Sequence, residues 1–193
     1  MATAAGAHAV VLPKATPEAV DALGSEGLPI VAIIETAQGV RLAFEIASKP
    51  RVVALQIGAV DLGAEVGLEP RADAQELLYV RSKVVLDSVA SGRRTPFDVV
   101  HLDIYDHDGL EAECRLARTL GFRGKACIHP GQVVIVNRAF TPTDAEIEWA
   151  KHVVGAYDLA TAGGQGVLTV SGSMVDLPVV ERARRVLAEA DRR

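Results

Sequence analysis

The stretches Ile30-Val31-Ala32-Ile33-Ile34 and Val52-Val53-Ala54-Leu55-Gln56-Ile57 decide the fold of this 193-residue chain. Both are rich in β-branched residues, and they are apolar at nearly every position instead of at every second one. Strands with this pattern are buried on both faces, which is typical of a parallel sheet covered by helices. The two stretches therefore predict neighbouring strands of such a sheet.

Three further apolar runs flank these two stretches, at residues 9–12, 97–104 and 125–128. After the first run, Thr16 is predicted as the N-cap of a helix that begins at Pro17. The other expected helices cover about 40–48, 72–90 and 110–120, and a Gly-rich acidic loop is expected at 61–69. Five β–α units in a row imply an α/β fold with right-handed crossovers.

The pattern changes after Pro130. A helix is expected to begin near Thr143, which could form a capping box with Glu146, and to continue to about residue 160. A short apolar run at 167–170 and a final helix at about 178–190 follow. We therefore expect a first domain at 1–140 and a C-terminal helical extension or lid at 141–193.

Composition excludes several classes of protein. The net charge of −5, with scattered basic residues, does not favour a nucleic-acid partner. No apolar run reaches the roughly 18 residues of a membrane span, so a cytoplasmic protein without a membrane partner is expected. Two cysteines give no disulfide framework, and Cys127, within an apolar run, is predicted to be a small core residue.

Polar side chains follow the predicted strands, at the edge where parallel α/β folds place their functional groups. Glu35 directly follows one strand and Asp61 lies just after the next. Two carboxylates on neighbouring strand ends can reach a common point, and magnesium is commonly held by one or two carboxylates. In the alternative interpretation, Glu35 caps the next helix or pairs with a lysine, and Asp61 caps a loop. The spacing leaves both open.

The other polar residues at these strand ends have simpler interpretations. Asp103, Asp106 and Asp108 are predicted to serve turns and helix caps. Lys125 is predicted to form a salt bridge beneath the rim, and His129 to be a turn residue before Pro130, although both could line the rim itself.

Five motifs carry a resemblance to a known family. They are residues 34–39 (IETAQG), 57–62 (IGAVDL), 121–130 (GFRGKACIHP), Pro13-Lys14 and residues 172–178 (GSMVDLP). In this order and spacing the chain resembles the citrate lyase beta subunit family, also called HpcH/HpaI aldolases. The resemblance implies a (β/α)8 TIM-type barrel in trimers or multiples of trimers. It also implies cleavage or formation of a C–C bond next to a carbonyl, in acyl-CoA thioesters such as malyl-, citramalyl- or citryl-CoA or in short 2-oxo acids.

The resemblance also implies roles for individual residues. Glu35 and Asp61 would bind Mg2+, and these two residues together with Gly58 and Ala59 would bind the substrate. Asp176 resembles an acid/base residue that some members supply from a neighbouring subunit. The alternative interpretation is that Asp176 only caps the last helix.

The chain departs from the family in its number of β–α units. It contains about five and starts near the family's fourth. It has no match to an acidic Asp-Leu-Glu-Asp segment of relatives, or to the arginine that neutralises the substrate carboxylate in them. It could be part of a complete enzyme, a short homologue whose sheet is completed by another subunit, or a non-catalytic relative that binds a partner or ligand. A homo-oligomer or a completing partner subunit is expected, and a pyruvate aldolase without CoA is a further alternative.

Overall fold

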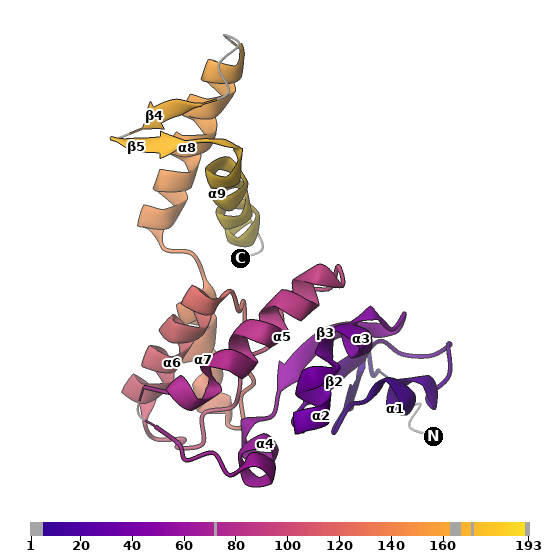
Figure 1. Cartoon of the computed structure of the whole chain (residues 1–193). Coiled ribbons are helices and arrows are strands. Elements are labelled where there is room, and N and C mark those ends of the chain that lie inside the picture. The colour runs from indigo at the N-terminus through magenta and orange to yellow at the C-terminus, as the bar shows by residue number, and fades with distance from the viewer. Residues whose placement is uncertain (1–5, 72, 163–166, 171, 192–193) are drawn as a thin grey trace. The chain divides into compact units, whose positions relative to one another are not determined.

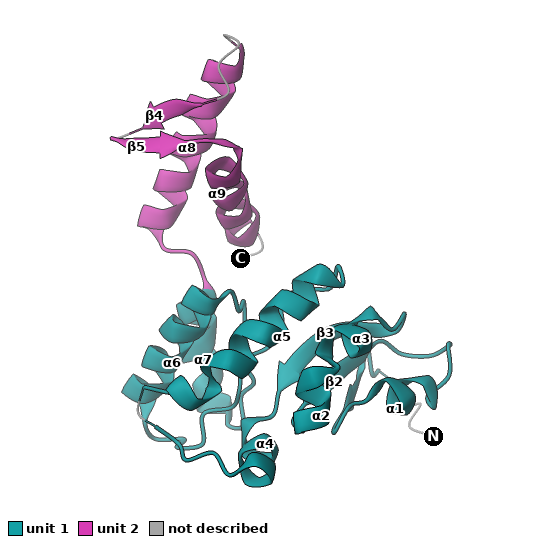
Figure 2. Cartoon of the chain, in the orientation of Figure 1, with its two compact units in different colours: residues 1–140 teal, residues 141–193 magenta. Residues whose placement is uncertain are grey.

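The computed structural model describes residues 6–71, 73–162, 167–170 and 172–191. The chain forms two compact units, Met1–Phe140 and Thr141–Arg193 (Figure 2). The first is an α/β unit built on a parallel sheet. The second contains two long helices and a two-stranded antiparallel sheet.

The first unit contains three strands, one short 3₁₀ helix and seven of the described α-helices (Figure 1). In chain order they are β1 (Val10–Leu12), α1 (Pro17–Asp21), β2 (Ile30–Ile34), α2 (Ala37–Arg41), α3 (Ala43–Ser48), β3 (Val52–Ile57), α4 (Ala59–Val66), η1 (Gln75–Leu77), α5 (Leu78–Ala90), α6 (His107–Leu120) and α7 (Pro130–Phe140). The strands pair in parallel in the order β1-β2-β3. Because β2 ends beside β3, with Ile34 opposite Ile57, the residues after these two strands meet at one edge of the sheet.

The two deciding stretches behave as predicted. The bounds of β2 and β3 are those of the apolar runs, and no residue in either strand is exposed. Thr16 caps α1, because its hydroxyl oxygen accepts a hydrogen bond from the Ala19 N–H at 3.1 Å, and Pro17 is the first helical residue. The helix expected at 40–48 is divided at Leu42 into α2 and α3.

The prediction of regular strands at 97–104 and 125–128 is wrong in extent. Only two parallel bridges between described residues continue the sheet, Gln56 with Phe97 and Asp98 with Lys125. After Val99 the chain turns, because the Asp103 carboxylate accepts hydrogen bonds from the N–H groups of Tyr105 and Asp106 at 2.9 and 3.3 Å. The two segments therefore extend the sheet in parallel, as expected, but side-chain capping ends them early.

The prediction of a loop at 61–69 is also wrong, because α4 covers residues 61–66 of this stretch. Gly67 ends this helix with φ of 73°, a left-handed C-cap that favours glycine. Asp61 lies in the first turn, where a carboxylate is stabilised by the helix dipole. Two further elements were not expected from the sequence, α7 and the strand β5 of the second unit. The helix predicted from about residue 72 begins as η1 and continues as α5, and residue 72 itself lies outside the described residues.

The second unit consists of α8 (Asp144–Ala162), β4 (Leu168–Val170), β5 (Ser173–Val175) and α9 (Leu177–Ala190). The predicted capping box is confirmed: the Thr143 N–H donates to Glu146 Oε2 at 2.7 Å, and the Glu146 N–H donates to Thr143 Oγ1 at 3.2 Å. Val153, Val175 and Val180 are among the buried residues of a separate core. The second unit thus has its own hydrophobic interior.

The prediction that Cys127 is a core residue is wrong, because this side chain is exposed. The chain leaves the sheet after Lys125, so the residues that follow are not sandwiched between helices. Cys114, on α6, is buried, and burial raises the pKa of its thiol to about 11. Within the described residues, no helix combines the length and the hydropathy needed to cross a bilayer.

Candidate functional site

Three consecutive strands end at the candidate site. Lys14 follows β1, Glu35 directly follows β2, and Gly58 directly follows β3 and precedes α4. The Gly58 N–H donates to the Ile34 carbonyl at 3.0 Å, and the Ala15 N–H donates to the Ile33 carbonyl at 3.1 Å. These backbone bonds hold the three strand ends together, so the positions of the side chains follow from the sheet.

Glu35 is a buried carboxylate, with only 8% of the residue exposed. Its Oε1 accepts a hydrogen bond from the Lys14 backbone N–H at 2.7 Å. The cap of α2 is Thr36, whose hydroxyl oxygen accepts from the Gly39 N–H at 2.9 Å. The alternative in which Glu35 caps the next helix is therefore wrong.

Gly58 gives Glu35 the space it occupies. A Cβ added to Gly58 would lie 2.5 Å from Glu35 Oε2 and 2.6 Å from Glu35 Cβ, distances that no real side chain tolerates. The glycine therefore shapes a cradle for the carboxylate and does not serve a left-handed turn, since its φ is −105°.

Substitution of Gly58 by alanine is expected to displace the Glu35 carboxylate and to weaken Mg2+ binding at least about tenfold, because partners that orient a metal ligand typically contribute 10–100-fold to affinity. Isothermal titration calorimetry with MgCl2 measures this change. The matched control is Gly63→Ala on α4, where the added Cβ would meet only Leu68 Cβ at 3.8 Å. Equal affinities of the two variants would contradict the role assigned to Gly58.

Asp61 is half exposed and reaches the Lys14 side chain from the first turn of α4. Its Oδ1 lies 2.9 Å from Lys14 Nζ, and 49% of the aspartate side chain and 64% of the lysine side chain are exposed. The hydrogen bond and the charge of Asp61 raise the pKa of Lys14 above its ordinary value. An ion pair with this exposure contributes little to stability, so it does not explain why the two charges meet here.

The structure thus brings Glu35, Gly58, Ala59 and Asp61 together and adds Lys14, which contacts both carboxylates. Two carboxylates from neighbouring strand ends suit a hard cation such as Mg2+, which keeps several water or substrate ligands. Among the described residues there is no group of three or more His, Cys, Asp or Glu side chains placed to hold a metal. A metal at this site would therefore rely on Glu35, Asp61 and oxygen atoms from water and substrate.

Glu65 belongs to this site and was missed by the sequence reasoning. Its Oε2 accepts from the Ala37 N–H at 3.2 Å, and its charge acts on Lys14. Glu65 lies one helical turn after Asp61, so recognising α4 would have placed both acids on one face.

A pocket of about 390 Å³ lies beside the site, and no motif in the sequence indicated it. It opens between α4, the segment that leads into η1, and the residues after Phe97. The apolar part of its lining includes Ala59, Val60, Leu68, Leu77, Val99 and Leu102. Ala59 therefore connects the pocket with the carboxylate site.

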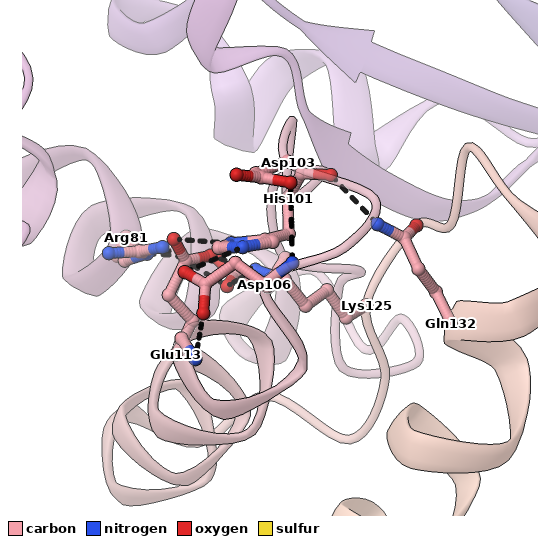
Figure 3. Close-up of polar contacts among 9 residues, drawn as sticks. Arg81, His101, Asp103, Asp106, Glu113, Lys125 and Gln132 are labelled. Carbon is pink, nitrogen blue, oxygen red and sulfur yellow. Dashed lines mark hydrogen bonds and ion pairs between the residues drawn. The ribbon is translucent and has the colours of Figure 1, made fainter.

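Lys125 belongs to a buried charge cluster, as the salt-bridge interpretation predicted (Figure 3). Two members of the cluster, Arg81 and Glu113, line the pocket. Lys125 Nζ lies 3.0 Å from Asp98 Oδ2 and 2.6 Å from Glu113 Oε2. Arg81 donates two further hydrogen bonds to Asp98, at 2.8 and 3.1 Å. The cluster joins α5 and α6 to the bridge between Asp98 and Lys125, so its placement indicates a structural role.

His129 and the three aspartates serve local structure. His129 Nδ1 accepts from the Gly131 N–H at 3.1 Å at the start of α7. Asp106 caps α6 by accepting from the Gly109 N–H at 2.9 Å, and Asp108 lies in the first turn of that helix. The turn and cap interpretations of these residues are confirmed.

Asp176 lies in the second unit, at the N-cap of α9. Its Oδ1 accepts from the Val179 N–H at 3.5 Å, and its backbone is extended, as in other N-cap residues. Asp176 therefore has a structural function whether or not it also takes part in chemistry.

The sequence model of the HpcH/HpaI aldolase/citrate lyase family matches residues 2–130, which include Lys14, Glu35 and Asp61. The chain belongs to this family. A (3S)-malyl-CoA thioesterase of Cereibacter sphaeroides is 40% identical over 191 residues, which are 97% of this chain and 66% of the thioesterase. The citrate lyase subunit beta of Leuconostoc mesenteroides subsp. cremoris is 38% identical over 163 residues, covering 84% of this chain and 54% of that subunit.

A solved structure of the family has the same fold. Protein CitE from Mycobacterium tuberculosis, in complex with magnesium, acetoacetate and coenzyme A, superposes with a TM-score of 0.83 at 36% identity. The match covers 95% of this chain and 68% of CitE. The chain spans just under two thirds of the malyl-CoA thioesterase. The family resemblance expected from the five motifs is thus confirmed.

Proposed function

We propose that this citrate lyase-family chain carries the metal and substrate site of a magnesium-dependent carbon–carbon lyase. The observation that carries the proposal is the convergence of Glu35 and Asp61 at two neighbouring strand ends, with Gly58 shaped to receive Glu35. A purely structural subunit would have no need for a buried carboxylate near a second one, since burial of a charge is costly. Magnesium bound in the CitE structure supports the same choice of metal.

The residues of the site would have two roles, metal binding and substrate binding. Glu35 and Asp61 would hold Mg2+, which acts as a Lewis acid on the carbonyl oxygen next to the bond that is cleaved or formed. The first N–H groups of α4, after Gly58, receive no side-chain cap. They can donate hydrogen bonds to a substrate carboxylate, a group that helix N-termini favour. Gly58 and Ala59 would therefore bind and orient the substrate.

The proposed substrates are short 2-oxo acids and their acyl-CoA derivatives. The apolar pocket next to Ala59 could accept the part of such a molecule that carries no charge. The relatives support a thioester as the substrate, since they include a (3S)-malyl-CoA thioesterase and a CitE structure in complex with coenzyme A.

We further propose that the sheet is part of a (β/α)8 barrel. Among the described residues, β1 pairs only with β2, which leaves a row of backbone groups free for another strand. A homo-oligomer or a completing partner subunit would supply the neighbouring surface. Light scattering after size exclusion tests the proposed assembly with other subunits. An active protein that is strictly monomeric would contradict that assembly.

Residues 141–193 are proposed to act as an extension that brings Asp176 to a substrate as an acid/base residue. Asp176→Asn separates this role from capping, because asparagine caps helices as well as aspartate does. We expect lyase activity to fall about 10²–10⁴-fold, the usual contribution of a general acid or base, with an unchanged thermal midpoint. Activity close to that of the unmodified protein would leave Asp176 as a cap alone.

Calorimetric titration tests the proposed function itself. We expect MgCl2 to bind at a single site, and oxaloacetate or acetoacetate to bind only when Mg2+ is present, with coenzyme A added in a parallel series. Assays of malyl-, citramalyl- and citryl-CoA cleavage follow. A folded protein that binds neither metal nor oxo acid would favour the alternative of a non-catalytic subunit.

A further inference from the structure

Lys14 has an unusual backbone conformation for its position at a strand end. Its φ is 46°, and Ala74 is the only other non-glycine residue in the described part of the chain with a positive φ. The left-handed region is unfavourable for residues that carry a Cβ. Strain of this kind persists where surrounding contacts enforce it, and it concentrates at functional sites. The contacts of Lys14 therefore identify what the conformation achieves.

This conformation lets one residue donate to both carboxylates of the site. The backbone N–H reaches Glu35 Oε1 at 2.7 Å, and the side-chain Nζ reaches Asp61 Oδ1 at 2.9 Å. The next N–H, of Ala15, is fixed on the Ile33 carbonyl, so the turn is held from both sides. Lys14 thus binds Glu35 through the main chain and Asp61 through its charge.

The two contacts have different consequences for a metal. The N–H on Oε1 orients Glu35 and leaves Oε2, which faces Gly58, without a hydrogen bond from any described residue. The ammonium group, by contrast, places a positive charge on Asp61, where the charges of Glu35 and Glu65 also act on it. A divalent cation that binds the same carboxylates must compete with this charge.

We propose that Lys14 is both a positioning residue and a counter-ion. Its N–H holds Glu35 in the orientation that binds Mg2+, while its ammonium group pairs with Asp61 until Mg2+ displaces it. This inference rests on the proposed function of the site. It goes further by assigning opposite effects to the main chain and the side chain of one residue.

Four variants test the inference by calorimetric titration of MgCl2 at low ionic strength. Lys14→Gly removes the ammonium group and adopts the left-handed conformation without strain. Lys14→Met keeps an unbranched side chain of similar size without the charge, and Lys14→Arg keeps the charge. The matched control is Lys49→Met, because Lys49 also pairs with an aspartate, Asp21, at 2.6 Å but lies away from the site.

We expect Lys14→Gly and Lys14→Met to bind Mg2+ about three- to fivefold more tightly than the unmodified protein, the scale of a partly exposed ion pair. Lys14→Arg and Lys49→Met should stay within about twofold. Lys14→Gly should also melt at a higher temperature than Lys14→Met, because only glycine relieves the strain. If Lys14→Met does not fold, Lys14→Gly still decides the result.

The outcomes separate this inference from the proposed function. Unchanged or weaker Mg2+ binding in Lys14→Gly, with normal binding by the unmodified protein, would overturn the counter-ion role alone. Absence of Mg2+ binding by the unmodified protein and by Lys14→Gly would overturn the metal site and the role of Lys14 together.

Discussion

Glu35→Gln and Asp61→Asn are each expected to lower the affinity for Mg2+ at least about a hundredfold and to abolish lyase activity. Loss of a partner that only orients a ligand already costs 10–100-fold, and these substitutions remove a charged ligand itself. Both amides keep the shape of the side chain, so the amide oxygen introduced by Glu35→Gln can still accept from the Lys14 N–H. Calorimetry and the CoA-thioester assays measure the two effects.

Asp21→Asn is the control for these two variants. Asp21 is a carboxylate in an ion pair with a lysine, as Asp61 is, but its partner Lys49 belongs to a different part of the first unit. Its substitution should leave the metal affinity within about twofold, because exposed pairs contribute little. Normal Mg2+ binding and turnover by either site variant would remove the metal site from this edge of the sheet.

Asp98→Ala is expected to destabilise the protein by about 3–5 kcal/mol, the cost of leaving a buried charge without its partner. Asp98 and Arg81 are 0% and 1% exposed, and Asp98 also binds Lys125. Removal of the carboxylate leaves the guanidinium group buried with no described acceptor, since its Nη1 already has none. Urea unfolding followed by circular dichroism measures the loss.

The chain offers a matched control for this prediction. Arg71 donates to Asp73 through the same two nitrogens, Nε and Nη2, both at 2.9 Å, but this pair lies at the surface. Asp73→Ala should leave the unfolding midpoint nearly unchanged, because solvent screens the pair and hydrates the freed arginine. Equal losses in Asp98→Ala and Asp73→Ala would mean that burial does not set the energy of these pairs.

The Asp98 cluster also explains why two predicted strands are short. Asp98 and Lys125 form the last bridge of the sheet among the described residues, and their side chains are used to join α5 and α6 to it. Beyond this bridge, Asp103 and His129 bind the backbone of the next turn or helix. Local apolar composition predicted strands here, but side-chain hydrogen bonds to the backbone provided an alternative to the ladder.

The candidate site could be predicted from the sequence in part. Glu35 and Asp61 follow from their positions after consecutive strands, since the ends of parallel strands share one edge. The capping box of Thr143 and Glu146 and the cap at Thr16 follow from local rules that need only a few residues. The helix that carries Asp61 was taken for a loop because glycine and acid residues are common in loops, and Glu65 was missed with it.

The sequence by itself determined that the strands are parallel, which helices carry N-cap signals, and the family, because each apolar run, cap and motif that indicates them is a short stretch of the chain. Only the tertiary structure decided which side chains contact one another at the site. Residues 47 positions apart put the Lys14 ammonium on Asp61, and a missing Cβ at Gly58 makes room for Glu35. Contacts of this kind depend on backbone conformation and on the register between strands, and no local pattern of polarity records them.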